Sequence, residues 1–369
     1  MAKKVAKKTV AEMAEDATAL LAEGAEFQEY TPQCPIDFTT LLDTGVGPLN
    51  QEISSRFYGG MPRSNCVRYS GKASSGKTFN LLSMLACAAN DPAYDDYALV
   101  ADDVENGMMM DMAKFGTKIQ KRLKRIRSLT LEESYFALMD QMEKGPCVYI
   151  IDSLDALSSK AEQDKTTKKR NAKTAKQKAE LSGDMSDGKA KVHSAMLRQL
   201  EPLWVKTGSI VVLVSQYRDD LKSKFGGGKE SGGRALEHYP SIHVKTAAVG
   251  KIEKIVLGSK RHIGNMVQAT VSKTRVIGGG GNKVVFPLYF DSGIDDIGAA
   301  VEYLISEKYW SEAAGKVEAP EFQYKGATEK LIVQLHDNPD ARQTLDVLCT
   351  RRWNEIRGGM KTGRKPRFA

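Results

Sequence analysis

Apolar residues follow two alternating patterns along this chain. Short apolar runs bounded by turn residues predict buried strands, and longer segments with apolar residues at helical spacing predict helices. The predicted strands are Cys66–Tyr69, Tyr97–Ala101, Cys147–Ile151, Ile210–Val214 and Ile242–Thr246. The predicted helices between them are Thr78–Ala89, Met108–Phe115, Leu131–Glu143 and Lys191–Lys206. Uninterrupted apolar strands separated by helices are typical of a parallel sheet covered on both faces, so the expected fold class is α/β.

The pattern changes after Gly250, where strands follow one another without helices. The predicted strands are Lys254–Leu257, Val267–Lys273 and Val284–Phe290, with a glycine run at 278–281 between the last two. We expect them to extend the same sheet in antiparallel fashion. The predicted helices after residue 294 are Ile297–Glu307, Ala327–Asp337 and Ala341–Ile356. These helices indicate a small α-rich C-terminal domain.

The segment before the sheet contains an Ala-rich helical pattern at residues 9–24, which follows a basic stretch and ends at Gly24. Residues 31–62 are punctuated by Pro and Gly and include a short helical segment around Phe38–Leu42. The expected parts of the chain are a basic N-terminal arm with an oligomerisation helix (1–45), a core (46–293), a small C-terminal domain (294–357) and a basic tail (358–369).

Composition limits the class of protein. An apolar fraction of 41% in 369 residues is enough for a large core, and the longest apolar run is six residues, far short of the ~18 that span a bilayer. The basic N-terminus is not followed by the apolar segment of a secretory signal. Five cysteines without a C-x-x-C pair indicate a reducing compartment rather than a disulfide framework or a zinc site. We expect a soluble, cytoplasmic protein.

The net charge of +8 is unevenly distributed. Residues 160–180 contain eight Lys or Arg against three acids, and residues 357–369 contain five bases and no acid. Such basic blocks indicate a polyanionic partner, although solvated faces and tails have the same composition. Residues 160–180 also have no apolar stripe, so the segment is expected to be a solvated helix or a mobile insertion.

An octapeptide between the first predicted strand and the first predicted helix matches the phosphate-binding pattern G-x-x-x-x-G-K-[ST]. Its residues are Gly71, Lys72, Ala73, Ser74, Ser75, Gly76, Lys77 and Thr78. Backbone N–H groups and the helix N-terminus bind the phosphates of such a loop, while its lysine reaches the β- and γ-phosphates and its hydroxyl binds Mg²⁺. A chance match would lack the strand–loop–helix context that the motif requires. The sequence therefore predicts binding of ATP with Mg²⁺.

Acidic residues follow two further predicted strands. Asp152 ends the run Cys147–Ile151 and suits the magnesium-binding Walker B position, although an aspartate there can also cap the following helix. A carboxylate is also needed to deprotonate water. Of the acids after Ala101, Glu105 is our first candidate and Asp103 the second. Gln216 follows a third strand, where an amide can contact the γ-phosphate, although a glutamine alone carries little information.

Several motifs in the same order resemble the RecA family of recombinases. They are the phosphate loop, Asp103–Glu105, Tyr149–Ser153, Val214–Arg218, the Gly-Gly-Arg-Ala-Leu segment at 232–241, the Lys-Thr-Arg segment at 271–275 and Asp337–Pro339. The resemblance covers residues 38–357 and implies a RecA-type ATPase core. It also implies that Glu105 activates water, that Asp152 holds magnesium through water, and that Gln216 couples the γ-phosphate to DNA. Lys273 and Arg275 would act in trans on the ATP of the adjacent subunit, although alternation at period 2 also fits a solvated strand face.

The resemblance implies two DNA-binding loops, at residues 182–189 and 217–234. The candidate DNA-binding residues are Gly183, Lys189, Tyr217, Arg218, Lys222, Lys224, Phe225, Lys229 and Arg234. Flexible glycines and basic side chains suit a loop that follows a phosphate backbone without reading sequence. A long charged surface loop is the alternative.

The sequence departs from the bacterial pattern at Ser215, which replaces an asparagine, in the insertion at 160–180, in the basic tail and in the spacing around residues 102–105. These departures indicate a divergent member and are compatible with a phage-encoded one. We expect an ATPase that forms helical homo-oligomers on single-stranded DNA and exchanges strands with double-stranded DNA in recombination and repair. A single-strand-binding protein and a loader are further candidate partners, and no membrane is expected. A ring-shaped helicase or translocase and a non-catalytic mediator are the alternatives.

Overall fold

The computed structural model describes residues 40–171, 186–219, 228–230 and 233–364. The chain divides by its internal contacts into residues 1–35 and 36–369, and all described residues belong to the second unit. The predicted helix at 9–24 and much of the predicted insertion therefore lie outside the described residues. No helix in the described ranges is long and apolar enough to cross a membrane.

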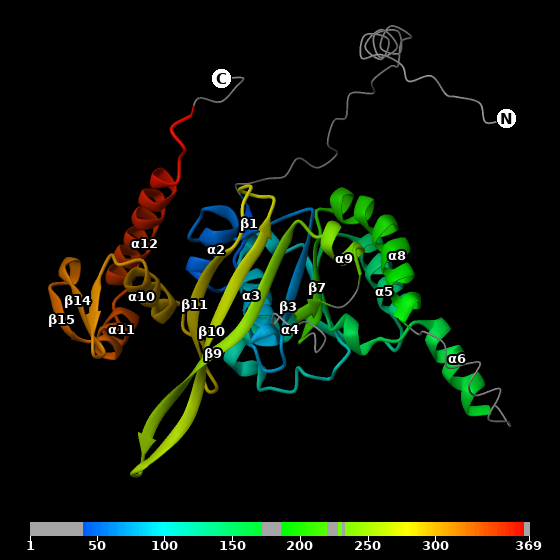
Figure 1. Cartoon of the computed structure of the whole chain (residues 1–369), viewed down its shortest axis with the longest axis horizontal. Helices are drawn as coiled ribbons and strands as arrows, with labels where there is room; N and C mark the ends of the chain where they lie inside the picture. The colour runs from blue at the N-terminus through cyan, green and yellow to red at the C-terminus, as the bar shows by residue number, and fades with distance from the viewer. Residues whose placement is uncertain (1–39, 172–185, 220–227, 231–232, 365–369) are drawn as a thin grey trace, which may run out of the picture. The chain divides into compact units, whose positions relative to one another are not determined.

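A large mixed sheet forms the centre of the described chain (Figure 1). Its strands, in spatial order, are β12 (Gly293–Ile294), β11 (Asn282–Tyr289), β10 (Ser259–Thr274), β9 (Ile242–Val256), β3 (Asn65–Gly71), β7 (Ile210–Asp219), β6 (Cys147–Asp152), β4 (Ala98–Asp103) and β5 (Leu123–Ile126). Neighbours from β9 to β5 are parallel, and neighbours from β9 to β12 are antiparallel. The short strand β8 (Gly228–Glu230) pairs with β7. The predicted parallel sheet with an antiparallel extension is confirmed.

Helices cover both faces of the parallel strands because alternate residues of each strand point to opposite sides. In β6, Val148 and Ile150 pack in one cluster with α3 (Lys77–Asn90), whereas Tyr149 and Ile151 pack in the other. The first cluster also includes α4 (Thr117–Arg122), and the second includes α5 (Leu131–Lys144) and α8 (Ser186–Thr207). The two buried faces explain why these strands are apolar throughout. The predicted helices at 78–89, 131–143 and 191–206 are confirmed.

The C-terminal part has a hydrophobic cluster of its own. Its elements are α10 (Asp296–Ser306), β13 (Ser311–Ala313), β14 (Lys316–Ala319), η4 (Pro320–Phe322), β15 (Tyr324–Ala327), α11 (Thr328–His336) and α12 (Pro339–Gly359). The three helices match the predicted ones. The small antiparallel sheet of β13, β14 and β15 was not predicted, since strands of three or four residues carry almost no periodic signal.

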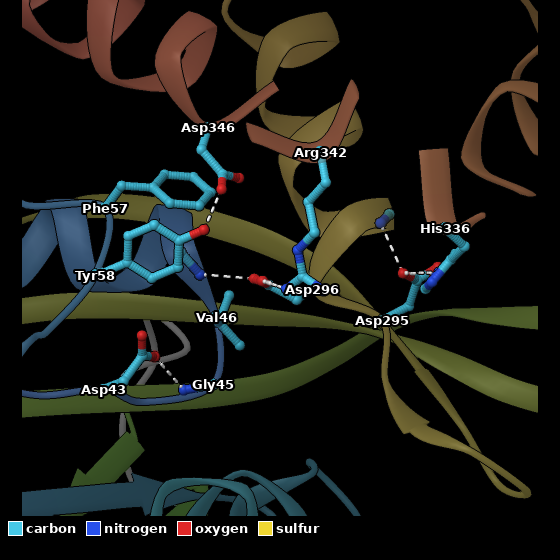
Figure 2. Close-up of polar contacts among 12 residues, drawn as sticks. Asp43, Gly45, Val46, Phe57, Tyr58, Asp295, Asp296, His336, Arg342 and Asp346 are labelled. Carbon is cyan, nitrogen blue, oxygen red and sulfur yellow. Dashed lines mark hydrogen bonds and ion pairs between the residues drawn. The ribbon is translucent and has the colours of Figure 1, made fainter. Parts of the chain in front are cut away.

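Polar contacts join the C-terminal part to the segment before the sheet (Figure 2). The Asp296 carboxylate accepts the backbone N–H of Gly47 at 2.9 Å and pairs with Arg342 at 3.2 Å. The hydroxyl of Tyr58 donates to Asp346 on α12. Burial, partly opposed by the Gly47 N–H, raises the pKa of Asp296 to about 6. Here α2 (Gly47–Ser54) docks with its N-terminus on an acid of α10.

Three sequence predictions need correction. The helix predicted at Met108–Phe115 is wrong: the Asp103 carboxylate binds the N–H groups of Gly107 and Met108, and only a 3₁₀ turn follows at Met112–Phe115 (η2). In the segment predicted to be helical around Phe38–Leu42, Leu41–Leu42 is a strand, β1, paired with β2 (Met61–Pro62). The strands predicted at 242–246 and 254–257 are one long strand, β9.

The first half of the predicted insertion is a helix, α6 (Lys160–Asn171), without a buried residue. This helix has no apolar face to bury, so the described half of the segment is a solvated helix, and residues 172–180 lie outside the described residues. Other short elements of the core are η1 (Pro92–Tyr94), η3 (Leu154–Ala156) and α9 (Ala235–His238).

Glu52 on α2 is expected to make the fold sensitive to pH. Its side chain is 7% exposed and accepts a hydrogen bond from Asn282 at 2.6 Å, and burial raises its pKa to about 7. The folded protein thus binds this proton more tightly than the unfolded chain, and the associated stability is lost as the pH rises from about 4.5 through 7. Glu52→Gln should remove up to about 3 kcal/mol of this pH dependence in urea unfolding. If the free energy of unfolding of Glu52→Gln depended on pH as that of the natural chain does, Glu52 would not be the group responsible.

Candidate nucleotide-binding site

The phosphate loop connects the end of β3 to the start of α3. Ser74 and Gly76 have φ values of 58° and 82°, a region that favours glycine. A side chain at Gly71 is excluded because its Cβ would lie 2.5 Å from the carbonyl oxygen of Thr246. The Ser75 hydroxyl is 2.9 Å from that of Thr246. The loop therefore contacts β9, and its backbone lies at the N-terminus of a 14-residue helix, where phosphates bind.

Lys77 folds back over the loop. Its Nζ donates to the carbonyl oxygens of Gly71 at 3.0 Å and Lys72 at 2.8 Å. Burial lowers the pKa of Lys77, and the nearby Asp152 and Glu105 carboxylates oppose this shift. The ammonium group is thus held at the loop by weak acceptors, and a phosphate would offer it stronger ones.

Thr78 and Asp152 form the oxygen pair expected of a magnesium site. The Thr78 hydroxyl donates to Asp152 Oδ2 at 2.7 Å, and Asp152 is 6% exposed. Burial raises the pKa of Asp152, the Thr78 bond lowers it, and the Glu105 charge raises it further. Magnesium takes one or two protein oxygens together with substrate phosphates and water. The donor set fits such an ion, and the described residues include no cluster of three or more His, Cys, Asp or Glu able to hold a metal alone.

The structure separates the candidate water-activating acids. Asp103 is buried and accepts the N–H groups of Gly107 at 2.7 Å and Met108 at 3.1 Å, and it pairs with Arg125 at 2.8 Å. Glu105 is exposed. Its Oε1 accepts from the Ser153 hydroxyl and from Gln216 Nε2 at 3.0 Å, while its backbone N–H lies 3.4 Å from the carbonyl of Asp152. Glu105 is therefore the acid that faces the magnesium-site residues, whereas Asp103 fixes the loop.

Asp102, the third acid of this strand, is a structural residue. It is fully buried and accepts the Ser128 N–H and the hydroxyls of Ser128 and Ser134 at 2.6–2.9 Å. Asp102→Ala would leave three buried donors without a partner, so we expect a loss of about 3 kcal/mol in the free energy of unfolding. Urea titration measures this, with Asp102→Asn as the milder variant because it keeps acceptor oxygen. If Asp102→Ala lowered the free energy of unfolding by less than the experimental error, Asp102 would not have this structural role.

Gln216 connects the site to the second predicted loop. Its backbone N–H donates to Asp155 at 2.6 Å, and its side chain reaches Glu105. Ser215 beside it accepts from Nε of Arg68 at 3.1 Å, and Arg68 also donates to the carbonyl of Leu236 on α9 at 3.4 Å. Arg68 is 1% exposed. Sequence reasoning missed it because an arginine inside an apolar strand gives no signal of its partners.

Lys273 is near the end of β10, and Arg275 directly follows the strand. Both side chains donate hydrogen bonds to backbone carbonyl oxygens at or just after the end of α9. Lys273 Nζ donates to Glu237 at 2.8 Å and Pro240 at 2.6 Å, and Arg275 donates to His238 at 3.1 Å. Burial and the neighbouring guanidinium lower the pKa of Lys273. Arg275 is exposed and Lys273 half-buried, and both cations donate to backbone oxygens.

The predicted DNA-binding residues are only partly described. Gly183, Lys222, Lys224 and Phe225 lie outside the described residues. Arg218 is in β7 and Lys229 in β8, which pair with each other, and only their backbones are described. Tyr217 is half-buried and Arg234 exposed at the start of α9. Lys189 donates to the carbonyl of Asp155 at 3.4 Å, the residue that also holds the Gln216 backbone.

Comparison with known proteins gives matches over most of the chain. The RecA N-terminal domain family matches residues 41–295. Protein RecA of Laribacter hongkongensis is 27% identical over 283 residues, which cover 74% of this chain and 70% of that protein. Protein RecA of Sulfurovum sp. is 24% identical over 320 residues and 84% of each chain. Protein RecA of Mycoplasma mycoides subsp. mycoides SC is 31% identical over 180 residues, which cover 43% of this chain and 49% of that protein. The range matched by the family contains the phosphate loop, Asp152, Glu105, Gln216, Lys273 and Arg275.

Proposed function

Because the chain belongs to the RecA family, we propose that it is a DNA-dependent ATPase that forms filaments on single-stranded DNA and exchanges strands with a homologous duplex. The single observation that supports ATP hydrolysis is the position of the Glu105 carboxylate. It lies beside the Thr78–Asp152 pair and is hydrogen-bonded to Gln216 at 3.0 Å. One acid thus contacts both the metal-binding segment and the strand that leads into the second loop.

ATP hydrolysis requires a positioned water and stabilised phosphates. We assign the phosphates to the loop at 71–78 and to Lys77, and the magnesium ion to Thr78 and Asp152. Magnesium would neutralise charge on the phosphate oxygens. Glu105 would take the proton from the attacking water, and Gln216 would orient the carboxylate and exchange its hydrogen bond for one to the γ-phosphate.

We place Lys273 and Arg275 in trans, on the ATP of the adjacent protomer. In the single chain they bind carbonyls at the end of α9 rather than the phosphate loop. A neighbouring γ-phosphate would be a stronger acceptor than a carbonyl for both cations. Such a contact joins two different surfaces of the protomer. When its repetition does not close a ring, it produces a helical filament. The helix at 9–24 is our candidate for packing on the neighbouring core.

Nucleotide state and DNA affinity would be coupled through Gln216. The residue directly precedes the segment 217–234, which we assign to DNA together with 182–189. If DNA binding favours the arrangement that holds the γ-phosphate, ATP must favour DNA binding by the same free energy. The single-strand-binding protein and the loader stay predictions on the same family basis.

The remaining assignments concern organisation and compartment. We keep the division into an N-terminal arm, a core, a small C-terminal domain and a tail as a proposal. Cys66, Cys87, Cys147 and Cys349 are free thiols, which suits the reducing cytoplasm in which we place the protein, or the host cytoplasm for a phage-encoded one.

Electron microscopy with single-stranded DNA and a slowly hydrolysed ATP analogue tests the proposal, followed by a strand-exchange assay with ATP. We expect helical filaments and exchanged strands. Closed hexameric rings with duplex unwinding would instead establish the helicase or translocase. Assembly on DNA without any ATP turnover would establish the non-catalytic mediator.

A further inference from the structure

Strands β9 and β10 continue beyond the sheet as a long two-stranded ribbon, residues 247–263, which we call the projecting hairpin (Figure 1). Pairing of β9 with β3 ends at Thr246, and pairing of β10 with β11 ends at Gly264. Within the described residues the hairpin thus has no third strand, and all of its side chains are exposed except the half-buried Ile252 and Ile263. A ribbon of this kind gains little from its own packing.

The tip of the hairpin is apolar. Leu257 is 100% exposed, and its neighbours Ile255 and Val256 are 70% and 40% exposed. Three consecutive exposed aliphatic residues on a loop tip gain nothing from burial in the single chain and favour aggregation. An exposed apolar patch of this kind marks a contact surface.

The backbone conformation at the tip is unfavourable for Leu257. Leu257 and Gly258 form the two-residue turn, with φ values of 50° and 77°. Both central residues of such a type I′ turn have positive φ, and asparagine followed by glycine is the preferred pair. A branched side chain is disfavoured at the first position. The chain thus places a leucine where both backbone conformation and solvent exposure oppose it, which points to a function for that side chain.

Cations surround this tip on both strands. Lys260 lies opposite Ile255 on the second rung from the turn, and Arg261 lies opposite Lys254 on the third. Lys251 precedes them, and Glu253, the one acid of the hairpin, lies 3.6 Å from Lys260. The flanks therefore carry an excess of positive charge next to an apolar point. This combination fits a partner with a polyanionic surface and an apolar interior.

The root of the hairpin lies beside the nucleotide site. Thr246 pairs with Gly71, and its hydroxyl contacts Ser75 of the phosphate loop at 2.9 Å. Gly71 also pairs with Gln216, so the hairpin leaves the sheet at the same edge as the second loop. A partner of the hairpin therefore lies on the side of the molecule from which the loop at 217–234 departs.

We propose that the projecting hairpin binds duplex DNA and that Leu257 inserts between stacked base pairs as a wedge, with Lys254, Lys260 and Arg261 on the flanking phosphates. Aliphatic side chains inserted in this way unstack a base step and kink the duplex. Cations on neighbouring phosphates supply the affinity that offsets the unstacking. The inference rests on the proposed function in one respect, since strand exchange needs a duplex to be opened.

The test measures duplex unstacking directly. A duplex carrying 2-aminopurine, whose fluorescence rises when the base is unstacked, is added to the full-length protein with a slowly hydrolysed ATP analogue, with and without single-stranded DNA. The duplex is not homologous to that strand, so base exchange cannot produce the signal. We expect a fluorescence rise with the natural chain and none with Leu257→Asn. We also expect the variant to bind duplex roughly tenfold or more weakly, because one leucine side chain is no longer buried.

Leu257→Asn removes the apolar side chain without destabilising the turn, because Asn-Gly suits a type I′ turn better than Leu-Gly. The melting temperature should therefore not fall, and loss of folding cannot explain loss of function. Leu257→Met, which keeps an apolar side chain, should retain the fluorescence rise. Val333→Asn, at another exposed apolar residue on α11 (54% exposed), is the matched control and should behave like the natural chain. Lys254→Ala should lower the salt dependence of duplex binding by about one phosphate contact.

Three outcomes would overturn the inference. The first is a fluorescence rise that Leu257→Asn leaves intact. The second is a loss of filament mass with normal duplex binding, which would show that the tip contacts a second copy of the chain. The third is Leu257-dependent binding to anionic phospholipid vesicles without any unstacking of DNA. ATP turnover stimulated by single-stranded DNA is measured in parallel, so a failure of the proposed function is recorded separately from a failure of the hairpin.

Discussion

Glu105→Gln is expected to abolish nearly all ATP turnover while leaving ATP binding and DNA-dependent assembly in place. Glutamine keeps the size of the side chain and an oxygen acceptor for the Ser153 hydroxyl and for Gln216, but it cannot take a proton from water. The loss of a general base lowers turnover by roughly 10²–10⁴-fold. Phosphate release gives the turnover, and binding of a fluorescent ATP analogue gives the affinity.

Asp103→Asn is the matched control because Asp103 was the second candidate base. Its carboxylate binds Arg125 and two backbone N–H groups. We therefore expect Asp103→Asn to lower thermal stability and to change turnover much less than Glu105→Gln does. The assignment fails if Asp103→Asn stops turnover without loss of stability while Glu105→Gln remains active.

Arg275→Ala is expected to lower DNA-stimulated turnover by roughly 10³-fold or more, as removal of an arginine finger does. Arg275 is exposed and donates to the carbonyl of His238 in the single chain, so its loss should not affect folding or ATP binding. Phosphate release and nucleotide affinity are measured as for Glu105→Gln.

A mixing experiment decides whether Arg275 acts in trans. Lys77→Ala removes the phosphate-loop lysine and should be inactive alone. In an equal mixture with Arg275→Ala, about a quarter of the heterologous interfaces combine an intact loop with an intact arginine. The mixture should therefore regain turnover that neither variant has. A mixture as inactive as its components would place Arg275 on the ATP of its own protomer or away from ATP.

Much of the catalytic core could be predicted from the sequence because its signals are local. The phosphate loop directly follows the buried strand β3, Asp152 ends β6 and Gln216 lies in β7, and the structure places them together at the carboxyl ends of neighbouring strands. The sequence ranked Glu105 before Asp103, but it could not show how their surroundings differ, since these involve Arg125, Ser153 and Gln216, which are distant in sequence.

The projecting hairpin could not be predicted from the apolar pattern of the sequence. Two separate strands were predicted at 242–246 and 254–257 because Gly250 and the surrounding polar residues interrupt the apolar pattern. In the structure the strand continues, since its backbone pairs with β10 and needs no buried face. The short sheet of the C-terminal part and the buried Arg68 were missed for a related reason: tertiary partners, rather than local periodicity, specify them.

The central claim is that ATP held between neighbouring protomers determines whether the assembly binds DNA. The most direct measurement is phosphate release with and without single-stranded DNA, together with the molecular mass of the protein by light scattering in the same samples. We predict that single-stranded DNA increases turnover and that the mass rises to that of a filament. A rate that is identical with and without DNA, from a protein that remains a monomer throughout, would contradict the account.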